Sequence, residues 1–361
     1  MKKLFKIVMV LLLIGSMFGC TKSGEGEGDT AKVDGCKTLN VYNASEYIGE
    51  DVLKNFEEEF GVKVNYSLFD SNEAMYIKLQ SGAKYDVIIP SDYMIERLIS
   101  EDMLQPIDKS IVTNLSNLYE GTLNKEYDPD NTYSVPYFWG NVGIVYDSTV
   151  VDQADVESQG WDVLRNTKYK GQIYMYDSQR DSFMMAFKAL GFSMNTENED
   201  EINQAYEWLL DIHKNMDPAY VTDEAIDGLI YGEKAMGMMY SGDAAYILSE
   251  NENMRFYIPS QGTNYWTDAM VIPANSKCPE LANEYINFIL DYDQSYDNSI
   301  TVGYASSNAE VFNELKDTEF EGNNAYAIPN MGPNDEVFRH NPVQVEKLSE
   351  LWIKVIATKR D

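Results

Sequence analysis

The amino-acid sequence predicts an α/β protein with a doubly wound sheet, and three observations support this fold class. Short apolar runs typical of strands alternate with segments of helical periodicity along most of the chain. The run 87–89 is continuously apolar and ends at Pro90, as expected for a strand that is buried on both faces. About 325 residues follow a polar N-terminal stretch, and a chain of that length usually forms two domains.

The first half of this pattern begins with a short apolar segment, 38–42, which is predicted as a strand. In 50–60, apolar side chains recur at helical spacing, and Gly61 ends the predicted helix. Residues 62–66 alternate apolar and polar side chains as a strand does, and 72–80 form the next helical segment. Strand and helix therefore alternate before the first buried strand is reached.

The second half continues the alternation. Strands are predicted at 144–146, 173–176 and 235–240, and a helix at 182–190. Open sheets of this kind bind ligands in the crevice beyond the carboxyl ends of their strands. A binding site is therefore expected in the segments that directly follow the strands.

These segments contain many carboxylates, hydroxyls and aromatic rings. They are 43–47, 90–93, 177–181, 241–243, 265–268 and 303–304. Taken singly, each side chain also fits a structural duty, as a helix cap or as a half-buried packing residue. The caps would be Ser45, Asp177, Ser241 and Asp243, and the packing residues Tyr93 and Tyr304. A carboxylate with a nearby ring recurs at several strand ends, however, and the fold would gather these ends in one cleft.

The N-terminal twenty residues have the order of a secretory signal. Three lysines precede an apolar run, 7–18, which ends at Gly19 and Cys20. A membrane-spanning helix needs about twenty apolar residues, so this run is too short. We expect 1–19 to be a signal peptide, with cleavage before Cys20 and lipid attachment to its thiol. The alternative is an ordinary signal in which the cysteine is incidental.

The stretch 20–36 is predicted to be a flexible, lipid-anchored tether. It is rich in Gly, Glu, Lys and Asp and has few apolar side chains, so it cannot bury a core of its own. The folded module is therefore expected to start near Lys37 and to work outside the membrane.

The chain is strongly acidic, with 28 Lys and Arg against 59 Asp and Glu and a formal net charge of -31. Without the three lysines of the signal segment, 25 basic and 59 acidic side chains give -34. We expect no nucleic-acid partner, because nucleic-acid binding draws on basic surface. A negative field instead concentrates cations near the protein. Solubility alone also explains most of this charge, so only particular carboxylates argue for a function.

Cysteine and histidine are scarce. With Cys20 lipidated, Cys36 and Cys278 remain in a compartment that permits disulfides, and both a bridge and two free thiols are left open. The 2 histidines, His213 and His340, provide no metal-ligand spacing. We therefore predict no metal and no cofactor.

A cleft that combines tyrosine and tryptophan rings with carboxylates suits an amine. Ring faces attract ammonium groups and pack well on methylene chains. Each carboxylate can hold an amine by a charge-assisted hydrogen bond worth about 1.5–3 kcal/mol. Two or three such bonds with aromatic contact can supply the roughly 8 kcal/mol of micromolar affinity. A linear polycation fits this description, whereas an anionic sugar, a phosphate or a metal oxyanion does not.

Several short motifs occur in the same order as in a known family. They are Asn-Ala-Ser-Glu-Tyr at 43–47, Ser-Asn-Glu-Ala-Met-Tyr at 71–76, Pro-Ser-Asp-Tyr at 90–93, Ile-Asp-Lys-Ser at 107–110, Tyr-Ser-Val-Pro-Tyr at 133–137, Trp-Thr-Asp at 266–268, Ile-Pro-Ala-Asn at 272–275 and Thr-Val-Gly-Tyr at 301–304. In these motifs the chain resembles the spermidine/putrescine-binding proteins of bacterial ABC importers. Each motif is weak alone, but together they extend from about Leu39 to the C-terminus, and their order makes the match specific.

The resemblance implies a two-lobed, periplasmic-binding-protein-like α/β fold of type II, with the ligand cleft between lobes joined by crossover strands. Lobe 1 would comprise 37–141 and 267–311, and lobe 2 would comprise 142–266 and 312–361. The resemblance also implies a polyamine ligand, the permease subunits of an ABC transporter as partners, and no enzymatic activity. We expect a monomer.

Roles in the cleft follow from the resemblance by position. Glu46, Asp268 and Asp181 match carboxylates that hold amines. The polar and aromatic contacts of lobe 1 would be Ser45, Tyr47, Ser91 and Tyr93. The aromatic box would be formed by Trp266, Tyr304 and Tyr240, the last standing where the family usually has a tryptophan.

Three positions depart from the family pattern. Ala44 replaces an aromatic residue and opens one side of the box. Ser178 stands where a carboxylate is expected, although Asp177 is adjacent and Asp243 offers a substitute. Arg339 falls where a neutral amide is expected, and a cation there would repel an amine unless it is salt-bridged. Asp177, Ser178, Asp243 and Arg339 are retained as candidate ligand-binding residues.

The leading interpretation is a lipid-anchored, extracytoplasmic protein that captures spermidine or putrescine and delivers it to an ABC permease. The alternative is a protein of the same fold for another cationic or zwitterionic solute, which Ala44 and Arg339 leave open. A secreted hydrolase that uses paired carboxylates of the cleft is a rival of a different class. The sequence lacks a Gly-x-Ser-x-Gly motif and a metal triad, which argues against this rival.

Overall fold

The computed structural model describes residues 35–44 and 47–360. The predicted signal peptide, 1–19, and the lipidation site Cys20 lie outside the described residues, as do the tether up to residue 34 and the two predicted ligand contacts Ser45 and Glu46. All of these assignments stay predictions.

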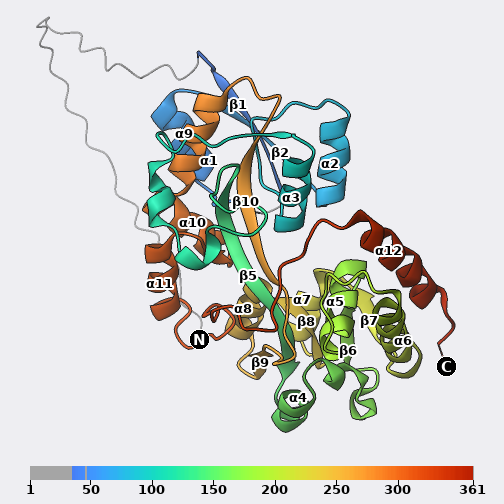
Figure 1. Cartoon of the computed structure of the whole chain (residues 1–361). Helices are drawn as coiled ribbons and strands as arrows, with labels where there is room; N and C mark the ends of the chain where they lie inside the picture. The colour runs from blue at the N-terminus through green and yellow to red at the C-terminus, as the bar shows by residue number, and fades with distance from the viewer. Residues whose placement is uncertain (1–34, 45–46, 361) are drawn as a thin grey trace, which may run out of the picture. The chain divides into compact units, whose positions relative to one another are not determined.

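Eleven strands and twelve α-helices form the described part of the chain (Figure 1). The strands are β1 (Thr38–Ala44), β2 (Lys63–Phe69), β3 (Val87–Ile88), β4 (Leu104–Gln105), β5 (Ser134–Asp147), β6 (Ile173–Tyr176), β7 (Ala219–Val221), β8 (Met236–Tyr240), β9 (Met254–Tyr257), β10 (Tyr265–Pro273) and β11 (Ala305–Ser306). The helices are α1 (Val52–Phe60), α2 (Asn72–Gln80), α3 (Asp92–Ser100), α4 (Gln153–Gln159), α5 (Gln179–Ala189), α6 (Glu199–Asn215), α7 (Glu224–Ile230), α8 (Ser241–Glu250), α9 (Pro279–Ile289), α10 (Tyr292–Val302), α11 (Ala309–Asp317) and α12 (Pro342–Ala357). Short 3₁₀ turns lie at Thr113–Asn117, Glu120–Thr122, Gly160–Arg165 and Thr167–Tyr169.

The sheet is mixed, with parallel strands at both ends and antiparallel strands between them. The order is β2-β1-β3-β10-β5-β8-β6-β7. Strands β2, β1 and β3 are parallel, as are β8, β6 and β7, whereas β10 and β5 pair antiparallel with their neighbours. The predicted α/β fold is confirmed, and the crossover strands that the resemblance implied are β5 and β10.

Figure 1 shows β5 and β10 side by side, running from the elements around β1–β3 to those around β6–β8. We call β1, β2 and β3 with α1, α2 and α3 the α3 side. We call β6, β7 and β8 with α5, α6, α7 and α8 the α5 side. The C-terminal helix α12 packs on α5 and α6, so the chain ends on the α5 side (Figure 1).

Strand β5 is much longer than the predicted strand at 144–146. Its fourteen residues are buried except for the last, so polar and apolar side chains do not alternate. Gly140 and Gly143 interrupt the apolar run. A Cβ at Gly140 would lie 2.6 Å from the Trp266 ring, so glycine permits a close approach of β5 to β10.

The prediction that 265–268 follows a strand is wrong, because these residues begin β10. The side chains of Trp266 and Asp268 therefore project from a crossing strand. No glycine or proline lies within 263–272 to distinguish strand from loop, and the aromatic and acidic residues resembled those of the loops.

The first turn of α5 starts three residues before the predicted helix at 182–190. Ser178 is its N-cap, and its hydroxyl accepts a hydrogen bond from the backbone N–H of Asp181 at 3.3 Å. Arg180 and Asp181 consequently lie on the rigid first turn of a helix. The N-cap is therefore Ser178 and not Asp177, which the sequence had suggested.

Cys36 and Cys278 form a disulfide, with their Cα atoms 6.0 Å apart. Cys36 precedes β1, and Cys278 is the N-cap of α9, beyond the end of β10. Of the two states left open by the sequence, the structure contains the bridge. Within residues 35–44 and 47–360, no helix has the length and apolar character that a membrane crossing requires.

Candidate functional site

A cavity of about 610 Å³ lies where the α3 side, the α5 side and β10 meet. Its volume is in the range of small-molecule sites, which is about 300–1,000 Å³. Ten predicted ligand-binding residues line it: Tyr47, Ser91, Tyr93, Asp177, Ser178, Asp181, Tyr240, Trp266, Asp268 and Tyr304. The fold therefore brings these side chains together in one cavity. Their contact with a ligand stays a prediction.

Asp268 projects from β10 at a point where the pairing with β5 is irregular, between Asp268 and Ala269. Its Oδ2 accepts a hydrogen bond from the Tyr47 hydroxyl at 2.7 Å. Burial raises the pKa of this carboxyl, and hydrogen bonds from Tyr47 and Ser91 only partly oppose the shift. No basic side chain of the described residues forms an ion pair with Asp268.

Asp92, at the start of α3, is a second buried carboxylate of the cavity and is 1% exposed. It accepts the backbone N–H of Tyr93 at 2.7 Å and that of Thr267 at 3.4 Å. Burial raises its pKa to about 8, and the nearby charge of Asp268 adds to the shift. A carboxylate held this far above its ordinary pKa would gain from a cation nearby.

The α5 side contributes Asp181 and, one layer behind the cavity, Asp243. Asp181 is 5% exposed and accepts the Tyr240 hydroxyl at 3.0 Å. Asp243 accepts the Tyr304 hydroxyl at 3.0 Å and is not among the lining residues. Burial raises the pKa of Asp181 and raises that of Asp243 to about 7. Asp243 therefore orients a wall residue of the cavity.

Aromatic rings form a continuous wall beside these carboxylates. The Trp266 ring lies 5.3 Å from that of Tyr304 and 6.1 Å from that of Tyr240, both nearly perpendicular. The Tyr47 ring lies 5.8 Å from Tyr304. Edge-to-face packing fixes these rings, leaving a rigid surface for an ammonium group or a methylene chain.

Arg180 is the basic side chain among the described residues that line the cavity. Its guanidinium carbon lies 3.8 Å from the centre of the Tyr93 ring, and its Nη2 lies 3.6 Å from Oε1 of Glu73. The protein itself therefore supplies a cation to one ring and one carboxylate of the site. Sequence reasoning missed this residue, although it lies within the segment 177–181.

Arg339 does not line the cavity, so the structure does not bring it together with the other candidates. Its guanidinium binds Glu96 at 2.6 Å and Glu126 at 2.6 Å. These two carboxylates provide the salt bridges that a cation near an amine site was expected to need. The hydrogen bond that Arg339 donates to Glu96 is the largest cause that raises the pKa of Arg339, and the charges of Glu96 and Glu126 add to it.

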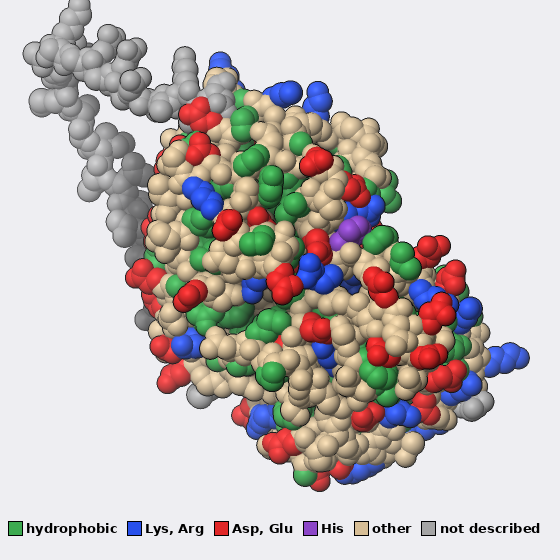
Figure 2. Space-filling view, in the orientation of Figure 1, with side chains coloured by type: hydrophobic (Ala, Val, Ile, Leu, Met, Phe, Trp, Pro, Cys, Tyr) green, Lys and Arg blue, Asp and Glu red, His purple; other side chains and the backbone are tan. Residues whose placement is uncertain are grey.

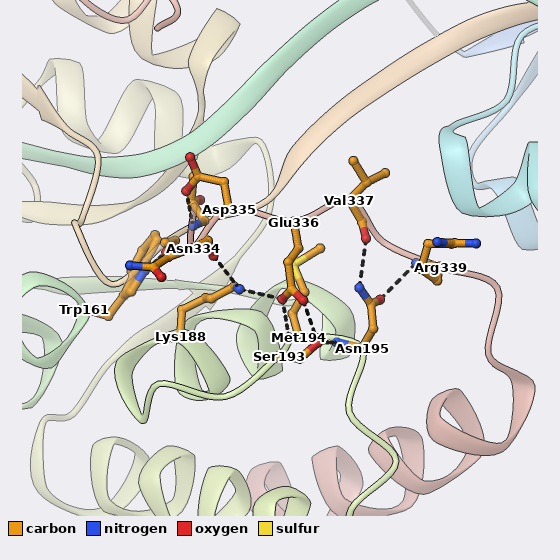
Figure 3. Close-up of polar contacts among 12 residues, drawn as sticks. Trp161, Lys188, Ser193, Met194, Asn195, Asn334, Asp335, Glu336, Val337 and Arg339 are labelled. Atoms are coloured by element: carbon orange, nitrogen blue, oxygen red, sulfur yellow. Dashed lines mark hydrogen bonds and ion pairs between the residues drawn. The ribbon is translucent and has the colours of Figure 1, made fainter. Parts of the chain in front are cut away.

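The residues before Arg339 are fixed to the α5 side by a polar cluster (Figure 3). Lys188 of α5 donates to Glu336 at 2.5 Å and to the carbonyl of Asn334 at 2.7 Å. Asn195 donates to the carbonyl of Val337 at 2.9 Å and accepts the N–H of Arg339 at 3.0 Å. We call residues 334–340 the 334–340 segment.

Sequence reasoning also missed Glu73, Asp92 and Phe338 as lining residues. Glu73 and Asp92 lie in motifs 71–76 and 90–93, and Asp92 directly follows a buried strand, so a signal existed. Phe338 has no comparable signal, because the surrounding segment has no strand or helix pattern. Within residues 35–44 and 47–360, no group of His, Cys, Asp and Glu is arranged to hold a metal ion.

Acidic side chains are not confined to the cavity. Figure 2 shows them spread over the visible face, with basic side chains between them. Much of the acidity therefore lies where it keeps the protein soluble. The cavity differs because two of its lining carboxylates, Asp92 and Asp181, are buried and form no ion pair with a basic side chain of the described residues.

A two-lobed α/β fold with a polar, aromatic cavity between its parts defines a solute-binding protein. The chain belongs to the family of bacterial extracellular solute-binding proteins, whose family model matches residues 51–326.

Individual relatives are similar over most of the chain. The spermidine/putrescine-binding periplasmic protein of Escherichia coli (strain K12) is 38% identical over 280 residues, which are 77% of this chain and 80% of that protein. A putrescine/cadaverine-binding protein of Pseudomonas aeruginosa is 31% identical over 297 residues, 79% of this chain and 84% of that protein. The structure of the spermidine/putrescine ABC transporter substrate-binding protein PotD from Streptococcus pneumoniae is 35% identical, with a TM-score of 0.78 and coverage of 89% of this chain and 98% of that chain.

Proposed function

We propose that this protein binds a polyamine of the spermidine and putrescine class and delivers it to an ABC permease. One observation carries the proposal. Asp92, Asp181 and Asp268 line one cavity, their pKa values are raised by burial, and aromatic rings lie beside them.

The partners of these carboxylates explain why a cation is the expected ligand. Asp268 has hydroxyl donors, Asp92 has backbone N–H donors, and Asp181 has a hydroxyl from Tyr240. Such donors orient a carboxylate, but they bring no net positive charge. Ammonium groups would supply that charge, and the carbon chain between them would lie against Trp266 and Tyr304.

The relatives support the same ligand class. Proteins that are 38% and 31% identical are named for spermidine, putrescine or cadaverine, all of them linear amines. The similar structure from Streptococcus pneumoniae is named as a substrate-binding protein of an ABC transporter. Permease subunits are therefore the protein partners that we propose.

We also propose the lobe boundaries 37–141 with 267–311, and 142–266 with 312–361. The cavity draws its carboxylates from both divisions, with Asp92 and Asp268 in the first and Asp181 in the second. A hinge motion that closes the two lobes would complete the set of amine contacts.

The site of action is proposed to be the outer surface of the cell membrane, where lipid on Cys20 would anchor a monomer. The family is extracellular, and the secretory pattern of 1–20 together with the polar stretch 20–36 supports a tether. Radiolabelled palmitate incorporated into the wild-type protein but not into Cys20→Ala would support this assignment, and equal labelling would refute it.

We propose binding without catalysis. The family consists of solute-binding proteins, and the cavity carboxylates have raised pKa values that suit cation binding. Release of a product from spermidine or from a glycan during incubation with the pure protein would contradict this part of the proposal.

A zwitterionic solute is the second candidate, because Arg180 lines the cavity and could hold a carboxylate. Arg180 already has Glu73 as a partner at 3.6 Å and stacks on Tyr93, so the polyamine remains favoured.

Calorimetry of ligand-free protein decides between the two candidates. Titration with putrescine, spermidine and cadaverine should give micromolar or tighter binding, whereas γ-aminobutyrate, lysine and glycine betaine should give none. Native mass spectrometry of protein purified without added ligand would reveal a retained polyamine. Binding of the zwitterions in preference to all three polyamines would overturn the proposal.

A further inference from the structure

Two arginines, one on the α5 side and one in the 334–340 segment, reach one face of helix α3. Arg180 of α5 stacks on Tyr93, and Arg339 of the 334–340 segment pairs with Glu96. Tyr93 and Glu96 are three residues apart in α3, so their side chains lie on the same helical face. Helix α3 starts directly after Ser91, a residue of the cavity wall, so its position sets the position of that wall.

Arg180 occupies a place that otherwise resembles an amine site. The Tyr93 hydroxyl donates to Glu73 at 3.2 Å, and the guanidinium of Arg180 lies against both residues. The Phe338 ring lies 5.4 Å from the guanidinium. The Arg180 side chain is 16% exposed, so this contact between the two sides is partly shielded from water.

Arg339 reaches α3 from a firmly held segment. Glu336 accepts hydrogen bonds from Lys188, Ser193 and the N–H of Met194, and its own N–H donates to the Thr263 carbonyl at 3.0 Å. Figure 3 shows Arg339 pointing away from this cluster. The 334–340 segment is fixed to the α5 side through Lys188. The contact of Arg339 with α3 therefore holds α3 against the α5 side.

Glu96 is the partner that gives this contact its geometry. Three hydrogen bonds join the Arg339 guanidinium to the Glu96 carboxylate, and the N–H of His340 donates to the same carboxylate at 2.6 Å. Burial opposes the ionisation of Glu96, but these donors still lower its pKa. Glu126 is 85% exposed, so its pair with Arg339 is screened by water and contributes little.

We propose that Arg180 and Arg339 are positioning residues that hold α3, with Ser91 and Tyr93, against the α5 side of the cavity. The two arginines provide a ligand-independent contribution to the closed arrangement, and a polyamine adds its own contacts to it. This inference rests on the proposed function for its binding readout, and it requires no contact between Arg339 and the ligand.

A positioning role predicts a uniform loss of affinity. If a variant lowers the closed fraction, the apparent affinity falls by that factor for every ligand that needs the closed form. We expect Arg339→Gln and Glu96→Gln each to weaken putrescine and spermidine binding by about three- to tenfold, with an unchanged ratio of the two affinities. The loss should appear as faster ligand release, and Arg339→Lys should restore part of it.

Arg97→Gln is the matched control. Arg97 also lies on α3, pairs with Glu101 at 2.9 Å and stacks on Tyr76 at 3.5 Å, but all three residues belong to the α3 side. This variant removes the same kinds of interaction without removing a hydrogen bond or an ion pair between the sides. Its affinities should equal those of the wild type.

Hydrogen exchange of the full, ligand-free protein tests the inference without any ligand. In Arg339→Gln and Arg180→Gln, backbone amides of 92–100 and 334–340 should exchange faster than in the wild type and Arg97→Gln, while those of α1 should not change. Should the wild-type protein bind no polyamine, the proposed function fails, and this measurement alone decides on the positioning role.

Calorimetry and stopped-flow release measurements complete the experiment. The double variant Arg339→Gln with Glu96→Gln should lose no more affinity than either single variant, since both remove one contact. The inference is overturned if exchange in α3 is unchanged in both arginine variants. It is also overturned if Arg339→Gln weakens only one of the two polyamines, because that result would mean direct contact with the ligand.

Discussion

The cavity and the 334–340 segment both contain carboxyl side chains, but their pKa values are shifted in opposite directions. In the cavity, Asp92 is buried and Asp268 is half-buried, and both have hydroxyl or N–H groups as partners. Burial raises the pKa values of both carboxyls. In the 334–340 segment, burial also opposes the ionisation of Glu336, but hydrogen bonds from Lys188 and its neighbours lower the pKa of this carboxyl. The difference is a basic partner in direct contact, because Lys188 forms an ion pair with Glu336 whereas no basic side chain of the described residues does so with Asp92 or Asp268.

This comparison separates carboxylates that hold the fold together from carboxylates available to a ligand. A buried carboxylate without a counter-charge lowers the stability of the protein, so it persists where binding a cation gives it a use. Glu336 is a half-buried carboxylate whose charge is already matched by Lys188. The predictions below test this division.

The largest expected effect is the loss of binding in Asp268→Asn. Removing the charge should weaken putrescine and spermidine binding by about ten- to a thousandfold, because a charge-assisted hydrogen bond to the amine is lost. The melting temperature of the ligand-free variant should stay equal or rise, since a desolvated carboxylate has gone. Calorimetry and thermal unfolding measure the two effects.

Asp86→Asn is the matched control for Asp268→Asn. Asp86 is also buried in the α3 side, but it accepts hydrogen bonds from Asn40 and Ser276, away from the cavity. This variant should lower stability and leave affinity unchanged. If Asp268→Asn bound both polyamines as tightly as the wild type, Asp268 would not be an amine contact.

Glu336→Gln should give the reverse result, a loss of stability with a smaller effect on binding. Lys188 is 4% exposed and would become a buried cation without its counter-charge. We expect unfolding in urea to show a loss of about 2–4 kcal/mol. Glu57→Gln is the control, because its partner Lys63 is 77% exposed and water screens the pair, so this variant should lose little stability. Equal losses in the two variants would contradict the division.

The pH dependence should also separate the two regions. Burial raises the pKa of Asp92 to about 8 and that of Asp243 to about 7, from the ordinary value of 3.8. Protonated in the fold, these groups stabilise it fully below about pH 4, and this contribution is lost as the pH rises through 7 and 8. The ligand-free protein should therefore melt at a lower temperature at pH 8 than at pH 6.

Polyamine binding should change with pH in the opposite direction. A cation binds the ionised carboxylates, so affinity should increase several-fold from pH 6 to pH 8. Glu96 and Glu336 do not contribute to this pH range, because their pKa values are lowered from 4.5. Their stabilising effect is present above pH 4.5 and is lost only in acid. Calorimetry at four pH values in buffers of different ionisation enthalpy would detect the released protons. An affinity that fell towards pH 8 would contradict this account.

The smallest expected effect belongs to Tyr240→Phe. This variant removes the hydroxyl that donates to Asp181 at 3.0 Å but keeps the ring beside Trp266. Asp181 would be harder to ionise, and polyamine affinity should fall by about two- to fivefold. A loss as large as that of Asp268→Asn would show that the hydroxyl contacts the ligand directly.

The sequence predicted elements whose patterns are local. The helix 72–80 occurs at the predicted residues because its N-cap, Ser71, directly precedes it. The strand 173–176 also occurs as predicted, because it is a short apolar run bounded by polar residues. The long strand β5 was predicted only in part, since burial on both faces removes the alternation that identifies a strand. The start of β10 was missed because its aromatic and acidic residues resembled those of the loops.

The site was predictable to the extent that its residues follow strands. Tyr93 and Asp181 were found in this way and line the cavity, whereas Tyr240, the last residue of β8, was found by the family resemblance. Phe338 and the partners of Arg339 were not, because they depend on where a segment without regular structure crosses the fold. Glu96, which binds Arg339, is 243 residues away in sequence. No pattern within a single stretch of sequence records such a pair.

The disulfide between Cys36 and Cys278 affects how the molecule would carry mechanical load. Cys36 and Cys278 are 242 residues apart in sequence, so a pull on the chain ahead of Cys36 is divided between the backbone of β1 and the N-terminus of α9. Neither β1 nor α9 therefore has to bear the whole force. If membrane lipid holds the protein by Cys20, flow past the cell would pull at this branch point rather than peel the first strand from the sheet.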